Sequence, residues 1–287
     1  MRWLSFLRDG NETFGYVVVG GDGSEGVVDA GARSEFVSLR EAIAADALTQ
    51  LTGNCGDQAD VPLADIDYLP TITDPAKIMC VGLNDKAHRE QAGRGGEGYR
   101  TIFVRFADAQ MGHNAPMVRP LESTSLDFEG EIALIIGKAG RRIKPADAMS
   151  HVAGFSIYND GSVRDYQRQT SQFTPGKNFA STGGFGPWMM TMDEVGDLDA
   201  MEITTRLNGE VMQNATSDLL VHGFAEILEY CSTFVELKPG DVLVTGTPGG
   251  VGAARKPPVF MDEGDLIEVE VKPIGTLSNP VVAEVAS

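Results

Sequence analysis

The chain has 287 residues, with 23 Lys and Arg against 41 Asp and Glu, so its formal net charge is −18. This acidic balance argues against a nucleic-acid partner, because the phosphate backbone attracts clustered positive charge. Hydrophobic residues make up 42% of the chain, enough for a large core, and its 34 Gly and 14 Pro favour strands and turns over a helical bundle.

At the start of the chain, residues 3–7 form an apolar patch that is too short for the core of a signal peptide. No later run approaches the roughly 18 apolar residues of a membrane helix. The three cysteines are widely separated, which favours a reducing compartment and argues against a disulfide framework or a thiolate zinc site. We therefore expect a cytoplasmic protein with no membrane partner.

The first 72 residues are expected to form a small leading domain of α/β type. A β-rich run at 13–20 predicts a strand, and the Gly-rich residues 21–26 predict a turn. Apolar residues at helical spacing predict one helix over 39–51, and the proline-rich segment 62–75 predicts the domain boundary.

The remaining residues, 73–287, are expected to form the larger domain. Short β-rich runs alternate there with Gly and Pro, and predict strands at 78–82, 102–106, 130–137, 151–159, 201–207, 241–245 and 266–271. One helix is predicted over 219–234, with an apolar stripe typical of core packing. Because no regular βαβ alternation occurs, the pattern favours a β-rich α+β fold.

Residues 127–137 are the most informative segment for chemistry. Side chains alternate between the two faces of a strand, so Glu129 and Glu131 share one face, which continues into Ala133 and Ile135. Two carboxylates about 7 Å apart along a strand that enters an apolar core repel each other, and a hard divalent cation would relieve that repulsion. The alternative is an edge strand whose carboxylates are solvated.

Three further segments carry candidate residues. Asp160 and Arg164 follow a predicted strand and could supply a third carboxylate and an anion-binding group, or form an ordinary turn with an exposed ion pair. His88 precedes a glycine-rich stretch that could act as a lid, although a lone histidine is more often structural. The glycines of 246–252 could admit an anion or simply make a tight turn.

The order of these segments closely resembles the fumarylacetoacetate hydrolase superfamily over about residues 76–287. The resemblance is carried by the motifs at 81–88, 127–137, 158–165, Lys177, 207–210, 245–252 and 264–280. It implies a mixed β-roll catalytic domain, usually a homodimer, preceded here by the small domain that longer bacterial members carry. It also implies Mg²⁺ or Mn²⁺, with Ca²⁺ as a possible substitute in a crystal, bound by Glu129, Glu131 and Asp160.

The same resemblance implies roles for other positions. Lys177 matches a lysine that faces the bound oxyanion, and the positions that match substrate-binding residues are Arg164, Gln167 and Thr247. In hydrolytic members a His–Glu pair activates water, which makes His88 with Glu90 or Gln91 the catalytic candidates. Gln91 stands where the family usually has Glu, while Glu90, two residues after His88, points away from it on a regular helix.

The expected function is hydrolysis of a C–C bond in an acylpyruvate or related β-diketo acid, through a metal-bound enolate. Gln91 makes a non-hydrolytic relative competitive, because an enolate serves decarboxylation and tautomerisation without activated water. Two alternatives therefore stay open. One is a 2-oxo-acid or oxaloacetate decarboxylase or an enol–keto isomerase of aromatic degradation, and the other is a silent protein that binds metal and 2-oxo acids.

Overall fold

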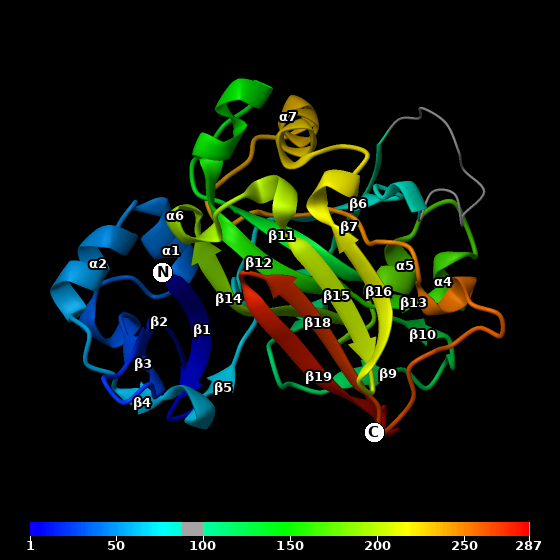
Figure 1. Ribbon diagram of the computed structural model, residues 1–287, viewed down its shortest axis with the longest axis horizontal. Coiled ribbons are helices and arrows are strands. Elements are labelled where there is room, and N and C mark those ends of the chain that lie inside the picture. The colour runs from blue at the N-terminus through cyan, green and yellow to red at the C-terminus, as the bar shows by residue number, and fades with distance from the viewer. Residues whose placement is uncertain (88–99, 287) are drawn as a thin grey trace.

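A single large sheet joins the leading residues to the rest of the molecule (Figure 1). The structure is a computed structural model that describes residues 1–87 and 100–286. Across the sheet the strands lie in the order β4 (Val61–Pro62), β3 (Glu25–Asp29), β2 (Asn11–Val19), β1 (Arg2–Arg8), β14 (Gly183–Thr191), β12 (Val152–Asp160), β11 (Gly130–Ile136), β17 (Val242–Val244), β6 (Ile78–Gly82) and β7 (Thr101–Arg105). Two short strands complete it, namely β5 (Asp67–Tyr68) beside β1 and β8 (Gln110–Met111) beside β14.

A second sheet packs over β11, β12 and β14. Its strands, in order, are β16 (Glu210–Thr216), β15 (Glu202–Leu207), β18 (Leu266–Lys272), β19 (Gly275–Ala283) and β9 (Met117–Arg119). A separate two-stranded ladder consists of β10 (Leu126–Asp127) and β13 (Ser162–Val163). Each predicted strand is present within a few residues of its predicted bounds, and the β-rich α+β fold is confirmed.

The α-helices of the described residues are short, except for the last one. They are α1 (Leu39–Ala44), α2 (Leu48–Cys55), α4 (Arg164–Gln167), α5 (Thr174–Lys177), α6 (Met192–Val195) and α7 (Phe224–Phe234). The single helix predicted over 39–51 was wrong. Asp46 adopts a left-handed conformation with φ of 53°, which ends α1 because a short polar side chain tolerates that conformation.

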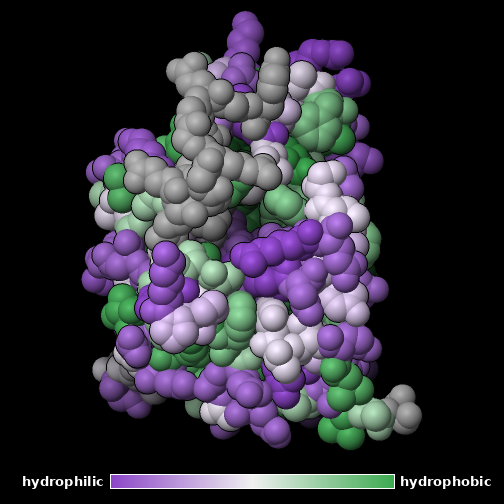
Figure 2. Space-filling view, turned by 90° about the vertical axis from the view of Figure 1, so that its right-hand side faces the viewer, coloured by the Kyte–Doolittle hydropathy of each residue, from purple (hydrophilic) through white to green (hydrophobic). Residues whose placement is uncertain are grey.

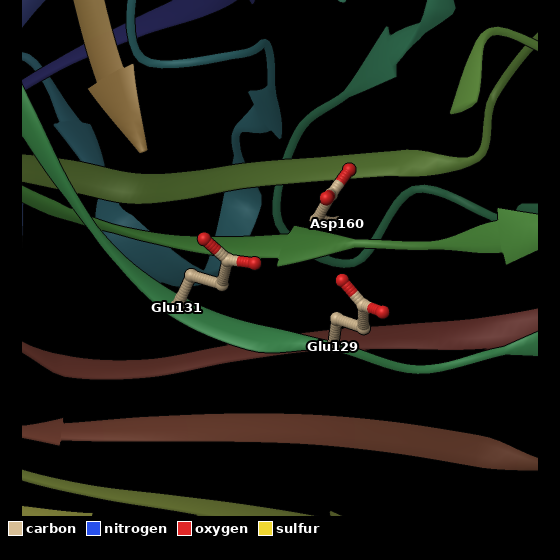
Figure 3. A group of neighbouring side chains, drawn as sticks. All are labelled: Glu129, Glu131 and Asp160. Atoms are coloured by element: carbon tan, nitrogen blue, oxygen red, sulfur yellow. The ribbon is translucent and has the colours of Figure 1, made fainter. Parts of the chain in front are cut away.

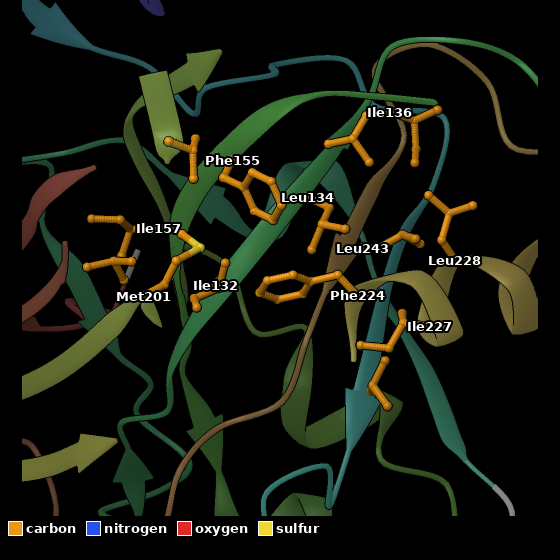
Figure 4. Close-up of a cluster of buried hydrophobic side chains, with 14 of the residues drawn as sticks. Ile132, Leu134, Ile136, Phe155, Ile157, Met201, Phe224, Ile227, Leu228 and Leu243 are labelled. Atoms are coloured by element: carbon orange, nitrogen blue, oxygen red, sulfur yellow. The ribbon is translucent and has the colours of Figure 1, made fainter. Parts of the chain in front are cut away.

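Helix α7 begins at Phe224, five residues after the predicted start. The segment before it is a short turn that ends in Gly223, whose backbone N–H donates to the Glu226 carboxylate at 3.1 Å. Four residues of the predicted apolar stripe are buried, namely Phe224, Ile227, Leu228 and Cys231. They pack against Ile132, Leu134 and Ile136 of β11 and against β12 (Figure 4). This face of β11 is therefore core.

The leading strands are an extension of the large sheet. The apolar patch at residues 3–7 belongs to β1, in which Trp3 pairs with Met189 of β14 and is only 1% exposed. Trp3 shares a hydrophobic cluster with Ala133 and Ile135, which lie on the second face of β11. The division into domains at residues 72 and 73 stays a prediction.

His113 offers a test of how burial affects stability. Its ring packs edge-on against Tyr68 with centroids 4.8 Å apart, and its Nδ1 accepts a hydrogen bond from the Ser278 N–H at 3.0 Å. Burial lowers the pKa of His113 to about 4, from an ordinary 6.5. The unfolded chain therefore binds a proton before the folded protein does, and stability is lost as the pH falls from 6.5 towards 4.

We expect this histidine to lower the free energy of unfolding by about 2 kcal/mol across that interval, after allowance for its partly exposed ring. His113→Asn keeps an acceptor for Ser278 and removes the titration, so its stability should fall less steeply with acid. Urea denaturation of both proteins at a series of pH values measures the difference. Parallel curves for the two proteins would contradict this origin of the acid sensitivity.

Candidate metal and substrate site

Three buried carboxylates meet between β11 and β12. Glu129, Glu131 and Asp160 each place one oxygen within 4.8 Å of the others, and none is more than 5% exposed (Figure 3). Oxygen ligands of this kind suit Mg²⁺, Mn²⁺ or Ca²⁺, whereas histidine and cysteine, which softer metals prefer, are absent from the group. The residues present therefore fit a hard divalent cation.

Strand pairing explains the convergence. β11 runs antiparallel to β12, with Glu131 opposite Tyr158, and the Asp160 N–H donates to the Glu129 carbonyl at 2.8 Å. Glu131 shares its face of β11 with Ala133 and Ile135, as the alternation predicts. The alternative of solvated carboxylates on an edge strand is wrong, because β11 lies between β12 and β17.

Three buried cations surround the carboxylates. Lys177 Nζ lies 2.8 Å from Glu129 Oε2 and 2.5 Å from Asp160 Oδ2. Arg164 Nη1 lies 2.6 Å from Glu129 Oε1, and Arg105 Nη1 lies 2.7 Å from Asp160 Oδ1. Ion pairs with these two carboxylates therefore hold them in place from several sides.

Glu131 has a different environment from the other two carboxylates. Its Oε2 accepts a hydrogen bond from the Gly246 N–H at 2.5 Å, and no salt bridge to it is formed within the described residues. Burial, followed by the charges of Asp160 and Glu129, raises the pKa of Glu131 well above its usual range. A divalent cation held by the three carboxylates would offset the cost of ionising Glu131.

Lys177 and Arg164 remain charged in this setting. Burial lowers the pKa of Lys177, but the carboxylates of Asp160 and Glu129 outweigh that effect, so its pKa is raised. Burial opposes the charge of Arg164 in the same way, and Asp127 and Glu129 again raise its pKa. Both side chains can therefore supply positive charge to an anionic ligand at neutral pH.

A small cavity of about 60 Å³ opens beside this cluster. Its polar lining contains six of the residues named from the sequence, namely Glu129, Glu131, Arg164, Gln167, Lys177 and Thr247. Arg164 Nη2 is buried and has no hydrogen-bond partner in the described part of the chain. Figure 2 looks onto the side that carries α4 and α5 and shows a hollow near the middle of that face, bordered by hydrophilic side chains.

The remaining sequence-predicted residues are placed differently. Asp160 does not line the cavity but lies beside it, fully buried. Thr247 lines the cavity, yet its hydroxyl donates to the Gly130 carbonyl at 3.0 Å and accepts from Gln213 Nε2 at 2.7 Å. His88, Glu90 and Gln91 lie outside the described residues, so their catalytic roles stay predictions.

Sequence reasoning missed two charged residues that support the site. Arg105, fully buried on β7, binds Asp160 and also donates to the Gly161 carbonyl at 2.8 Å. Asp127 accepts from Arg164 Nε at 2.8 Å and from the N–H groups of Gly252 and Ala253. Arg105 could have been noticed in the sequence, because a charged residue on the buried face of a predicted strand requires a partner. No sequence pattern indicated that the partner is Asp160.

Comparison with known proteins identifies the relatives of this chain. The profile described as "Fumarylacetoacetate (FAA) hydrolase C-terminal" matches residues 77–282. The chain is 40% identical over 224 residues to the mitochondrial oxaloacetate tautomerase FAHD2A of Bos taurus, covering 77% of this chain and 71% of the relative. The Homo sapiens protein of the same name is 39% identical over 224 residues, with the same coverage.

Two solved structures extend the likeness to nearly the whole chain. A fumarylacetoacetate hydrolase from Exiguobacterium antarcticum has a TM-score of 0.83 and 33% identity, covering 99% of this chain and 100% of its own. A 5-carboxymethyl-2-hydroxymuconate delta-isomerase from Mycobacterium smegmatis has a TM-score of 0.80 and 30% identity, with the same coverage. Within the described residues, no helix is long and apolar enough to cross a membrane.

Proposed function

Because this chain belongs to the fumarylacetoacetate hydrolase family, we propose that it is a divalent-metal-dependent enol–keto tautomerase of small 2-oxo dicarboxylic acids such as oxaloacetate. The observation that carries the proposal is the cluster of three buried carboxylates beside Lys177 and Arg164 in a small cavity. The names of the curated relatives favour tautomerisation over the hydrolysis expected first from the sequence.

The proposed cation ligands are Glu129, Glu131 and Asp160, with Mg²⁺ or Mn²⁺ as the ion. When bound, such an ion supplies a Lewis acid for the 2-oxo group and its neighbouring carboxylate. The protein's part is to hold the three carboxylates close together. Lys177 and Arg164 serve this purpose, since each pairs with Glu129 from a different side.

Lys177 and Arg164 also act on the substrate. Lys177 Nζ places a fixed positive charge at the cavity wall, where it stabilises negative charge that develops on the substrate oxygen. Arg164 Nη2 is free to donate to a substrate carboxylate, and Gln167 is held beside it by a 2.9 Å bond to Arg164 Nη1. Phe103 and Phe173 form an apolar part of the wall, which limits water around these charges.

Hydrolysis of a β-diketo acid is the second candidate. The observation that favours it is the 33% identity to a fumarylacetoacetate hydrolase over nearly the whole chain. It requires a group that activates water, and the predicted candidates for that group are His88 with Glu90 or Gln91. Tautomerisation needs proton transfer without added water, so the glutamine at position 91 is compatible with it.

A test of the function uses the purified protein with Mg²⁺ or Mn²⁺. Enol-oxaloacetate should lose its enol absorbance faster than in buffer with metal alone, while the total concentration of oxaloacetate, enol plus keto, remains constant. Release of CO₂ and pyruvate would instead identify a decarboxylase, and release of pyruvate with an acid from acylpyruvates would identify a hydrolase. No turnover together with metal-dependent binding of oxalate would indicate the silent binding protein.

The homodimer implied by the family resemblance also remains a prediction. Light scattering coupled to size-exclusion chromatography measures the oligomeric state directly. The location in the cell is likewise a prediction, and the names of the curated relatives include the word mitochondrial.

A further inference from the structure

Gln213 connects the second sheet to the metal-ligand strand. It lies on β16 and is only 1% exposed. Its Oε1 accepts from the Gly130 N–H at 3.0 Å, while its Nε2 donates to Thr247 Oγ1 at 2.7 Å and to the Pro248 carbonyl at 2.9 Å. Both amide protons and one acceptor of this side chain are therefore used within the protein.

The residue that Gln213 holds is the one between two proposed ligands. Gly130 separates Glu129 from Glu131, and its carbonyl accepts from Thr247 Oγ1 at 3.0 Å. A closed ring of hydrogen bonds thus runs through Gln213, Thr247 and both backbone groups of Gly130. Neither peptide bond of Gly130 can rotate without breaking a buried hydrogen bond.

Two further contacts restrict the backbone and the side chains of the proposed ligands next to this ring. The turn that contains Thr247 also contains Gly246, whose N–H binds Glu131 Oε2 at 2.5 Å. On the other side of Gly130, a Cβ atom would lie only 2.2 Å from Thr205 Oγ1, so the backbone is enclosed there as well. The position and direction of Glu129 and Glu131 therefore depend on contacts that start from the second sheet.

We propose that Gln213 is a positioning residue of the metal centre, which sets the spacing of Glu129 and Glu131 through Gly130 and the Thr247 turn. The inference rests on the proposed metal site and adds a residue that does not itself line the cavity. Partners beyond the ligands commonly orient metal ligands in this way, and their loss typically costs about 10–100-fold in metal affinity.

The decisive variant is Gln213→Leu, which removes all three hydrogen bonds at similar size. We expect its affinity for Mn²⁺ to fall about 10–100-fold, with a changed electron paramagnetic resonance spectrum of the bound ion. Gln213→Glu loses both donors but retains an acceptor for the Gly130 N–H. Its affinity for Mn²⁺ should therefore fall less than that of Gln213→Leu. Titration calorimetry with Mn²⁺ alone, at a temperature where circular dichroism shows folded protein, measures each affinity.

Asn279→Leu is the matched control. Asn279 is also 1% exposed, lies on β19 of the same sheet, and donates at 2.8 Å to the carbonyls of Gly112 and Ala115. The Asn279→Leu variant should have a melting temperature about as low as that of Gln213→Leu. Its Mn²⁺ affinity and the spectrum of its bound Mn²⁺ should equal those of the wild type.

The outcomes distinguish a failure of the Gln213 role from a failure of the metal site. Unchanged affinity in folded Gln213→Leu, or an equal loss in Asn279→Leu, would overturn the role of Gln213 while the wild type still binds Mn²⁺. If Gln213→Leu does not fold, unchanged affinity in Gln213→Glu overturns it instead. Failure of the wild type to bind Mn²⁺ would overturn the metal centre and this role together.

Discussion

Replacing Glu131 by Gln will lower the rate of the proposed tautomerisation about 10³-fold, equivalent to about 4 kcal/mol of lost transition-state stabilisation. Glu131 is the proposed ligand whose carboxylate has no cationic partner in the described part of the chain, so a bound metal ion would be its counter-charge. Glutamine keeps the size and an oxygen for the Gly246 N–H but removes the charge. Stopped-flow measurement of enol-oxaloacetate decay with Mg²⁺ gives the rate.

Stability provides an independent measure of the same substitution. Burial and the two neighbouring carboxylates raise the pKa of Glu131, so Glu131→Gln removes a carboxylate whose charge the fold disfavours without metal. We expect similar melting temperatures for the two proteins without metal, and a rise on adding Mn²⁺ for the wild type alone. Glu270→Gln, which alters a partly exposed carboxylate paired with Arg206, should retain both the rate and the rise.

Lys177→Met is expected to have the second large effect. It removes a buried ammonium group that lies within 2.8 Å of both Glu129 and Asp160, and leaves those carboxylates without one of their counter-charges. Loss of one partner from a buried ion pair costs about 3–5 kcal/mol, so the metal-free variant should be less stable by about that amount. The rate should fall about 10²–10³-fold, because the positive charge at the cavity wall is lost.

A bound dication should restore part of that stability, because it supplies positive charge to the same carboxylates. Urea denaturation with and without Mn²⁺ tests this, and the loss caused by Lys177→Met should be smaller with the metal. Lys272→Met is the control, since Lys272 is 63% exposed and its solvent-screened pair with Glu202 contributes little to stability. If Mn²⁺ does not change the loss of stability caused by Lys177→Met, the metal does not bind the carboxylates that pair with Lys177.

The chemistry of β11 could be predicted because its pattern is local. The alternation of side chains placed Glu129 and Glu131 on one face with Ala133, and the apolar run after them indicated burial. The structure adds that Glu129 precedes the first paired residue of the strand. Its place in the cluster depends on the hydrogen bond between the Asp160 N–H and its carbonyl, which no local pattern specifies.

The contacts that Arg105 and Gln213 make at the site could not be predicted, because each joins segments that lie far apart in the sequence. Arg105 and Asp160 are 55 positions apart, and Gln213 and Gly130 are 83 positions apart. Their contacts depend on which strands become neighbours in the two sheets, and hydrophobic periodicity does not carry that information. Asp160 itself was assigned as a ligand through family resemblance, and the reaction type follows from relatives more than from any spacing.

The pairing of β1 with β14 has a consequence for synthesis on the ribosome. The hairpin of β1 and β2 can form early and β5 can then cover the other edge of β1 at Phe6 and Leu7, but the Trp3 end of that edge has to wait for Met189. At 5–20 residues per second that interval is roughly ten to forty seconds. During it the nascent chain displays an open apolar strand edge, which chaperones recognise and which competing chains can pair with.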